Sequence, residues 1–209
     1  DVNGNYQDAS GTVQNTINKA VATVSVSGYT TTYDGLSHVA TGTVTGVGNT
    51  VLAGLNLNST AHANAGTYVD TWAFRDLTGN YVSVSGTVTD VINKANATIT
   101  VTGYSTAYDG KTHTATGTVL GAGNVSLKGL SLTGTTHTAA GSYNDTWTFT
   151  DTTGNYNNAT GKVADLISQD QTSVSLAAVP ATATTAKGQV TITATVANQT
   201  NSTTVNSGT

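Results

Sequence analysis

The chain has 209 residues, a net charge of -4, only 9% charged residues, and no Cys or Met. This charge offers no cationic surface to a nucleic-acid backbone, and no apolar run approaches the ~20 residues that span a membrane. The absence of Cys excludes disulfides and thiolate chemistry. Abundant Thr and Val, with few good helix formers, favour strands over helices.

An internal repeat organises the chain. Ile17-Asn18-Lys19-Ala20 recurs 75 residues later as Ile92-Asn93-Lys94-Ala95. Two units, 17–91 and 92–166, align without a gap, and about 43 of their 75 positions are identical. Residues 1–16 align with the end of a unit, so we interpret them as the C-terminal strand of a preceding repeat. The pattern changes after 166, which predicts that 167–209 begin a different module.

Within the first unit, the alternation of Ala22–Ser27 predicts a half-buried strand. Tyr33-Asp34-Gly35 predicts a turn, because Asp and Gly tolerate positive φ. The alternating runs His38–Val44 and Leu52–Leu57 predict two further strands. The strongest strand pattern begins at Gly66.

The two copies indicate which face of that strand is packed. Tyr68, Asp70, Trp72 and Phe74 share one face and are identical in the second unit, as Tyr143, Asp145, Trp147 and Phe149. The opposite face changes between copies, as where Val69 becomes Asn144. We therefore expect the aromatic face to be buried, where its rings make the largest hydrophobic contribution.

The end of each unit predicts a hairpin turn at Asp76–Asn80 and a last strand at Tyr81–Val88. Six or seven short strands with frequent turns are typical of an all-β fold, a small β-sandwich. The short Ile-Asn-Lys links leave little slack, so we expect tandem sandwiches in an elongated rod. Beyond the repeats, 172–176 and 189–196 predict two strands joined by a connection that contains Pro180.

The ordered motifs of residues 1–166 resemble a known family. Ile-Asn-Lys-Ala, Tyr-Asp-Gly, His-x-Ala-Thr-Gly-Thr, Tyr-x-Asp-Thr-Trp-x-Phe and Thr-Gly-Asn-Tyr follow one another as in bacterial Ig-like repeats of the MBG or YDG type. The segment after Asp170 resembles the start of another bacterial Ig-like module. The resemblance implies a secreted or cell-surface protein that acts as a stalk, adhesin or fibre, and it carries no common catalytic residues.

The aspartate on the aromatic face needs a partner, because an unpaired carboxylate among rings is unfavourable. Backbone amides, a Tyr hydroxyl or a His would supply one. The alternative is a self-formed Lys–Asn isopeptide cross-link assisted by that carboxylate, a reaction of neighbouring groups. The residues of the required types in the two units are Lys19, Asp70 and Asn80, and Lys94, Asp145 and Asn155.

Other polar residues have structural interpretations. His38 and His62, with their copies His113 and His137, are 24 residues apart and form no local metal-ligand or catalytic motif. We interpret them as structural histidines near strand ends. The aspartates of the Asp-Gly and Asp-x-Thr-Gly turns favour a turn role over calcium binding, because no Asp-x-Asp-x-Asp run occurs. They are Asp34, Asp76, Asp109 and Asp151.

The main functional hypothesis is an extracellular stalk or fibre without enzymatic activity or cofactors, whose partners are its neighbouring repeats. One alternative is a glycan- or matrix-binding module that uses exposed tyrosines, either Tyr29 and Tyr104 or Tyr33 and Tyr108. Another is a filament subunit, in which Asp1–Thr16 of one copy completes a sheet of the next.

Overall fold

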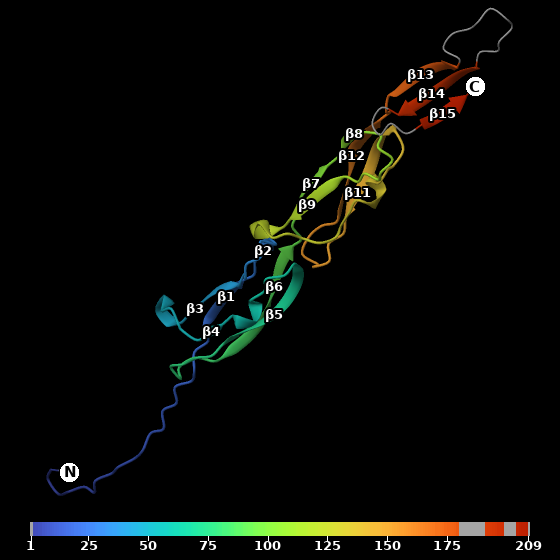
Figure 1. The fold of residues 1–209 in the computed structure, drawn as a ribbon. Helices are drawn as coiled ribbons and strands as arrows, with labels where there is room; N and C mark the ends of the chain where they lie inside the picture. Colours follow the sequence, from blue (N-terminus) through green and yellow to red (C-terminus); the bar gives the residue numbers. More distant parts are fainter. Residues whose placement is uncertain (1, 180–190, 199–203, 209) are drawn as a thin grey trace, which may run out of the picture. The chain divides into compact units, whose positions relative to one another are not determined.

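The computed structural model describes residues 2–179, 191–198 and 204–208 (Figure 1). The fold is all-β, as predicted, and the helical segments in the described ranges are three-residue 3-10 turns. The chain divides into two compact units, 1–93 and 94–209. No helix in the described ranges is long and apolar enough to cross a membrane.

The first unit contains two sheets (Figure 1). Two strands form an antiparallel pair, and the other four are ordered β2-β6-β5-β4, with β2 parallel to β6 and the remaining pairs antiparallel. The strands are β1 (Thr23–Ser27), β2 (Thr30–Thr32), β3 (Thr41–Thr45), β4 (Leu55–Asn56), β5 (Gly66–Phe74) and β6 (Val84–Asn93), and the 3-10 turns are η1 (Val47–Asn49) and η2 (Asn58–Thr60).

Side chains from both sheets meet in the core of this unit. Ala22, Val44 and Phe74 form a buried cluster, against which Leu52, Leu55 and Tyr81 pack among others. The side chains of β5 alternate between buried and exposed, with the aromatic face on the more buried side. Phe74 is 1% exposed, whereas Val69 on the opposite face is 71% exposed. The predicted packed face is therefore confirmed.

Several strand limits differ from the prediction. His38 forms only an isolated bridge, and the strand of that region begins at Thr41. The last strand was expected at Tyr81–Val88, whereas β6 begins at Val84 and continues to Asn93, two residues beyond the end of the first repeat. It extends that far because Ile92 packs within the first unit, where it is 2% exposed. Strand β2 was not predicted, since Thr30–Thr32 has no apolar alternation.

The second unit repeats this arrangement with the sheet orders β7-β9 and β10-β11-β12-β8. Its repeat strands are β7 (Thr98–Thr102), β8 (Ser105–Ala107), β9 (Thr116–Leu120), β10 (Leu130–Ser131), β11 (Gly141–Phe149) and β12 (Ala159–Ser168), and its 3-10 turns are η3 (Ala122–Asn124) and η4 (Thr133–Thr135).

A third sheet follows in the same unit. It is antiparallel, in the order β13 (Thr172–Val179), β14 (Thr191–Asn198) and β15 (Thr204–Gly208). The first two strands correspond to the two that the sequence predicts, and the third was not predicted. The Pro180 connection lies outside the described residues.

The N-terminal segment differs in structure from the ends of the two repeats, with which its sequence aligns. Residues 2–19 form no strand, although they align with the turn and last strand of a unit. Ile17 is 97% exposed, whereas its counterparts Ile92 and Ile167 are 2% and 1% exposed. The two buried isoleucines lie on strands that pair with β5 or β11, and the segment around Ile17 has no such neighbour among the described residues.

Candidate functional site

A histidine–aspartate pair is the most polar part of the packed face of β5. Asp70 stands on the inward side of this strand, between Tyr68 and Trp72. Its Oδ2 atom lies 2.8 Å from Nε2 of His62, and the two side chains are only 14% and 21% exposed. The ring of His62 stacks on that of Tyr68 with centroids 3.6 Å apart. The imidazole is therefore the partner that the carboxylate requires.

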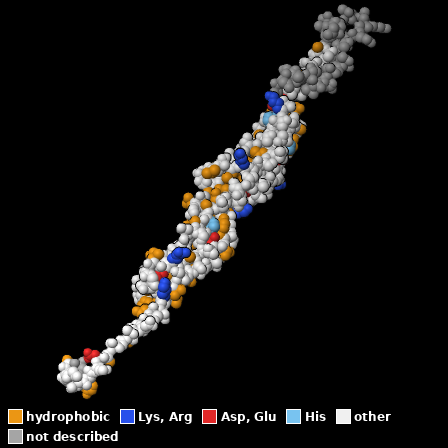
Figure 2. Space-filling model, turned by 90° about the horizontal axis from the view of Figure 1, so that it is seen from below, with side chains coloured by type: hydrophobic (Ala, Val, Ile, Leu, Met, Phe, Trp, Pro, Cys, Tyr) orange, Lys and Arg blue, Asp and Glu red, His pale blue; other side chains and the backbone are white. Residues whose placement is uncertain are grey.

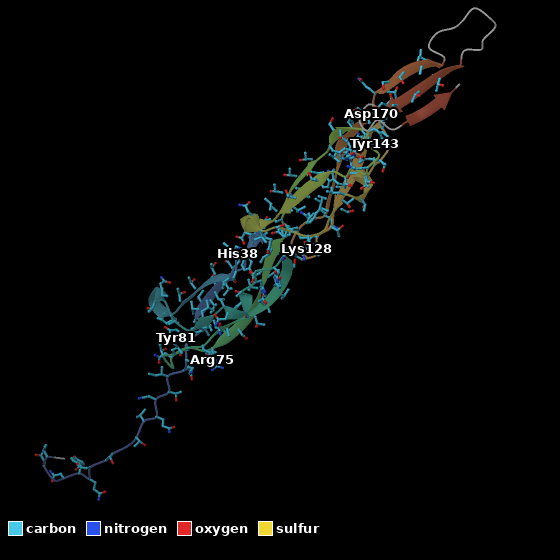
Figure 3. All side chains as sticks on the ribbon, viewed as in Figure 1. His38, Arg75, Tyr81, Lys128, Tyr143 and Asp170 are labelled. Carbon is cyan, nitrogen blue, oxygen red and sulfur yellow. The ribbon has the colours of Figure 1, made fainter. Side chains whose placement is uncertain are left out.

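A second histidine lies beside the first. The backbones of His38 and His62 form an antiparallel bridge, in which each N–H donates to the carbonyl oxygen of the other at 2.9 and 3.0 Å. Nε2 of His38 lies 3.0 Å from Oδ1 of Asp34, in the predicted turn. Figure 3 shows His38 at the opposite end of the first unit from Tyr81 and Arg75. Only the fold brings the two histidines together, because their spacing in sequence gives no local motif.

We call this arrangement of two His–Asp pairs the His–Asp cluster, and each unit contains one. In the second unit the backbones of the two histidines are bridged in the same way. The His137–Asp145 and His113–Asp109 pairs have the same separations as in the first unit, 2.8 and 3.0 Å, and the ring of His137 stacks on that of Tyr143 at 3.6 Å.

Hydrogen bonds shift the pKa of Asp34 and burial shifts that of Tyr29, two groups beside the cluster. The backbone N–H of Leu36, followed by the imidazole of His38, lowers the pKa of Asp34 below its ordinary value. Burial, reinforced by the charges of Asp90 and Asp70, raises the pKa of Tyr29. This tyrosine therefore keeps its proton at neutral pH and donates it to the carbonyl oxygen of Thr60 at 3.2 Å.

A buried carboxylate near the cluster was missed by the sequence reasoning. Asp90 on β6 has no exposed surface, and its Oδ1 accepts the backbone N–H of Tyr29 at 3.0 Å. Its Oδ2 has no hydrogen-bond partner, and Asp165 in the second unit repeats both features. Gly28 permits this approach, because a Cβ there would collide with the carbonyl oxygen of Thr89. The identity of this aspartate in the two copies was the available signal.

Two substitutions of Asp90 test whether the stability of the unit requires a carboxylate at this position or only a hydrogen-bond acceptor. We expect Asp90→Asn to be at least as stable as the parent, because it keeps an acceptor for Tyr29 and removes the buried carboxylate oxygen that has no hydrogen-bond partner. Asp90→Ala should be less stable by about 1–3 kcal/mol, because it leaves that buried N–H unpaired. Urea denaturation of both variants measures the effect, and a less stable Asn variant would contradict it.

Asp76 accepts three hydrogen bonds in the turn after β5. Oδ1 of Asp76 accepts the N–H and the hydroxyl of Thr78 at 2.9 and 2.8 Å, and Oδ2 accepts the N–H of Tyr81 at 2.8 Å. Burial raises the pKa of Asp76, but these bonds and the charge of Lys19 outweigh it and lower the pKa from 3.8 to about 2. The turn role predicted for this residue is confirmed, and Asp151 has the same role in the second unit.

The lowered pKa of Asp76 predicts a pH dependence. A carboxylate with a depressed folded-state pKa stabilises the fold above pH 3.8, and this stabilisation is lost as the pH falls toward about 2. Asp76→Asn should therefore flatten the decrease in melting temperature of the first unit across that window. Circular dichroism melts between pH 2 and 5 measure it, with Asp8→Asn in the exposed N-terminal segment as the control. An unchanged slope would contradict this role.

The residues proposed for a cross-link are only partly brought together. Lys19 and Asn80 both line a hollow of about 480 Å³, where the N–H of Ala20 donates to the carbonyl oxygen of Asn80 at 2.9 Å. Asp70 is not among its lining residues and pairs with His62 instead, whereas Asp76 is close enough for the charge of Lys19 to affect it.

In the second unit, Lys94 is exposed, Asn155 is 6% exposed, and Asp145 pairs with His137. The cross-link stays a prediction. Intact mass checks it, because each bond releases one ammonia.

The tyrosines considered for ligand binding differ in exposure. Tyr29 and Tyr104 are half-buried, and their hydroxyls donate to the carbonyl oxygens of Thr60 and Thr135. Tyr33 is also half-buried, whereas Tyr108 is 37% exposed. Of these four tyrosines, Tyr108 is therefore the most exposed.

Chemically, the His–Asp cluster links segments of its own unit. Both imidazoles are hydrogen-bonded to carboxylates, and their backbones join the segment before β3 to the segment before β5. Within the described ranges, no group of three or more His or Asp side chains could hold a metal ion.

No known family model matches this chain, and no curated protein is significantly similar to it.

Proposed function

We propose that this chain is a structural repeat region of a bacterial extracellular surface protein, an adhesin stalk or fibre built from Ig-like β-sandwich units in an elongated rod. The observation that carries the proposal is that one six-stranded arrangement occurs twice in direct succession. The His–Asp cluster is repeated with the same hydrogen bonds, so its polar side chains serve the unit itself.

The surface supports the same function. Figure 2 shows that charged side chains are scattered singly over a face that is mostly uncharged. The outward face of β11 carries only Ser, Asn and Thr, and that of β5 alternates Thr with Val69 and Ala73. Such a surface remains soluble through hydroxyl groups and offers no continuous charged patch to a nucleic acid.

Small-angle scattering of the whole chain tests the rod. A compact protein of this length has a radius of gyration of about 17 Å, and we expect a value well above it. A flexible Gly-Ser insertion after Asn93 should broaden the distance distribution if a short link keeps the units aligned. A radius near 17 Å would contradict the proposal.

Labelling of intact cells with an antibody against the chain tests the extracellular location.

A filament subunit is a second candidate, which the exposed N-terminal segment favours. Val13 and Ile17 are 85% and 97% exposed although they align with inward-facing positions of β6. Burying such side chains against a sheet of another copy would stabilise an assembly. Analytical ultracentrifugation should then show polymers that disappear when residues 1–16 are deleted, and unchanged polymers would exclude the idea.

A further inference from the structure

A hollow of about 530 Å³ lies in the second unit, between the end of the repeat and the third sheet. Its volume falls in the range of about 300–1,000 Å³ that is usual for small-ligand sites. We call it the terminal hollow. Besides two alanines, it is lined by Tyr108, Thr138, Gln169, Asp170, Thr172 and Asn198, all within the described ranges.

Backbone hydrogen bonds position these side chains. The N–H of Tyr108 donates to the carbonyl oxygen of Ser168 at 2.9 Å, which places the tyrosine beside the end of β12. Thr172 and Asn198 are opposite each other in the β13–β14 register, so their side chains stand next to each other on one face. The terminal hollow is therefore lined by two strand-end residues, Thr172 and Asn198, and by short connecting segments next to strand ends.

The hydrogen-bonding groups and the charge of the lining residues indicate which class of ligand fits the terminal hollow. Gln169 and Asn198 each offer both donors and acceptors, and the hydroxyls of Thr138 and Thr172 do the same. The side chain of Asp170 accepts hydrogen bonds, as it does from the N–H of Gln171 at 2.9 Å. Among the described residues, the lining contains no lysine, arginine or histidine, so the charge that these residues present to an anionic ligand is the negative charge of the aspartate.

We propose that the terminal hollow binds a neutral saccharide. Tyr108 is 37% exposed and lines the hollow, so its ring can pack on the C–H face of a pyranose. The amides, hydroxyls and carboxylate match the hydroxyl groups of the sugar, each of which both donates and accepts. This combination of one aromatic surface with several two-way hydrogen-bonding groups suits a polyhydroxylated ligand better than a hydrocarbon one.

The site belongs to the second unit alone. The copy of Tyr108 in the first unit, Tyr33, is half-buried, and the copy of Thr138 is Ala63, which has no hydroxyl. The segment that supplies Thr172 and Asn198 lies beyond the repeated part of the chain. The proposal does not depend on the chain forming a rod, so either can fail without the other.

An array of neutral and sialylated glycans, probed with the whole chain, tests the proposal. We expect binding to neutral glycans and not to sialylated ones. Titration of the best neutral disaccharide, followed by nuclear magnetic resonance, should shift the amide signals of Tyr108, Gln169 and Asn198. Tyr108→Ala should weaken binding at least tenfold, and Asp170→Asn should weaken it by a smaller factor.

Tyr6→Ala is the matched control, because it removes the same ring from a position that is 82% exposed and outside the hollow. Fluorescence of Trp147 in a Trp72→Phe background tests whether the repeat stays folded in the Tyr108 variant. The proposal would be overturned if no neutral glycan bound at millimolar concentration, or if the Tyr108 variant bound them as well as the parent chain does. Binding of tetramethylammonium without binding of neutral glycans would also overturn it, because that would indicate a cation site.

Discussion

Phe74→Ala is expected to lower the free energy of unfolding of the first unit by about 3–5 kcal/mol, the usual effect of removing a fully buried ring. Phe74 is 1% exposed and belongs to the cluster that joins the two sheets of the unit. The measurement is urea denaturation followed by Trp72 fluorescence in a Trp147→Phe background, which is possible because the chain has only two tryptophans.

The control is on the same strand. Val69→Ala removes an apolar group from the opposite face of β5, where the side chain is 71% exposed. Its effect should stay within about 0.5 kcal/mol. If the two substitutions changed stability equally, the assignment of the packed face would be wrong. Phe149→Ala should repeat the large effect in the second unit, because Phe149 is also 1% exposed.

Gly86→Val is expected to destabilise the first unit by about 1–3 kcal/mol through overpacking. Gly86 is directly opposite Trp72 in the β5–β6 register, and the indole lies over the glycine. A Cβ at this position would lie 2.5 Å from Cζ2 of Trp72, so the ring has to move away from the sheet. Its fluorescence should shift to the red as it becomes more exposed to water.

The chain supplies a matched control for this substitution as well. Gly11 occupies the position equivalent to Gly86 in the N-terminal segment, and a Cβ there would meet no atom within 4 Å. Gly11→Val should therefore leave the stability and the Trp72 spectrum unchanged. Gly161→Val should reproduce the effect on Trp147, since that indole lies over Gly161 in the same register. An unshifted spectrum in Gly86→Val would contradict the packing of tryptophan on glycine.

The predictions that succeeded from sequence depend on local periodicity and on the duplication. The period-2 pattern of β5 and the identity of its aromatic face in both copies were enough to identify the buried side of the strand. Asp76 could be assigned to a turn because its side chain bonds backbone groups only two and five residues away. These contacts are short-range, so the residue types and their spacing determine them.

The structural features that the sequence did not predict depend on strand pairing. Nothing in the spacing of His38 and His62 indicates a backbone bridge between them. Similarly, Asp90 looks like one polar residue in an alternating run, and only the packing of Tyr29 and Gly28 against β6 makes it a buried carboxylate. Contacts between distant segments follow from how the strands are ordered in the sheets, which a linear pattern does not encode.

The sequence by itself therefore determined the all-β fold class, the 75-residue period and the inward face of β5, because each follows from the alternation and repetition of residue types. The tertiary structure alone decided which carboxylate meets which imidazole, which of the tyrosines is exposed, and where the terminal hollow forms. These features depend on side chains from strands far apart in the chain, and pairing register and packing set their positions.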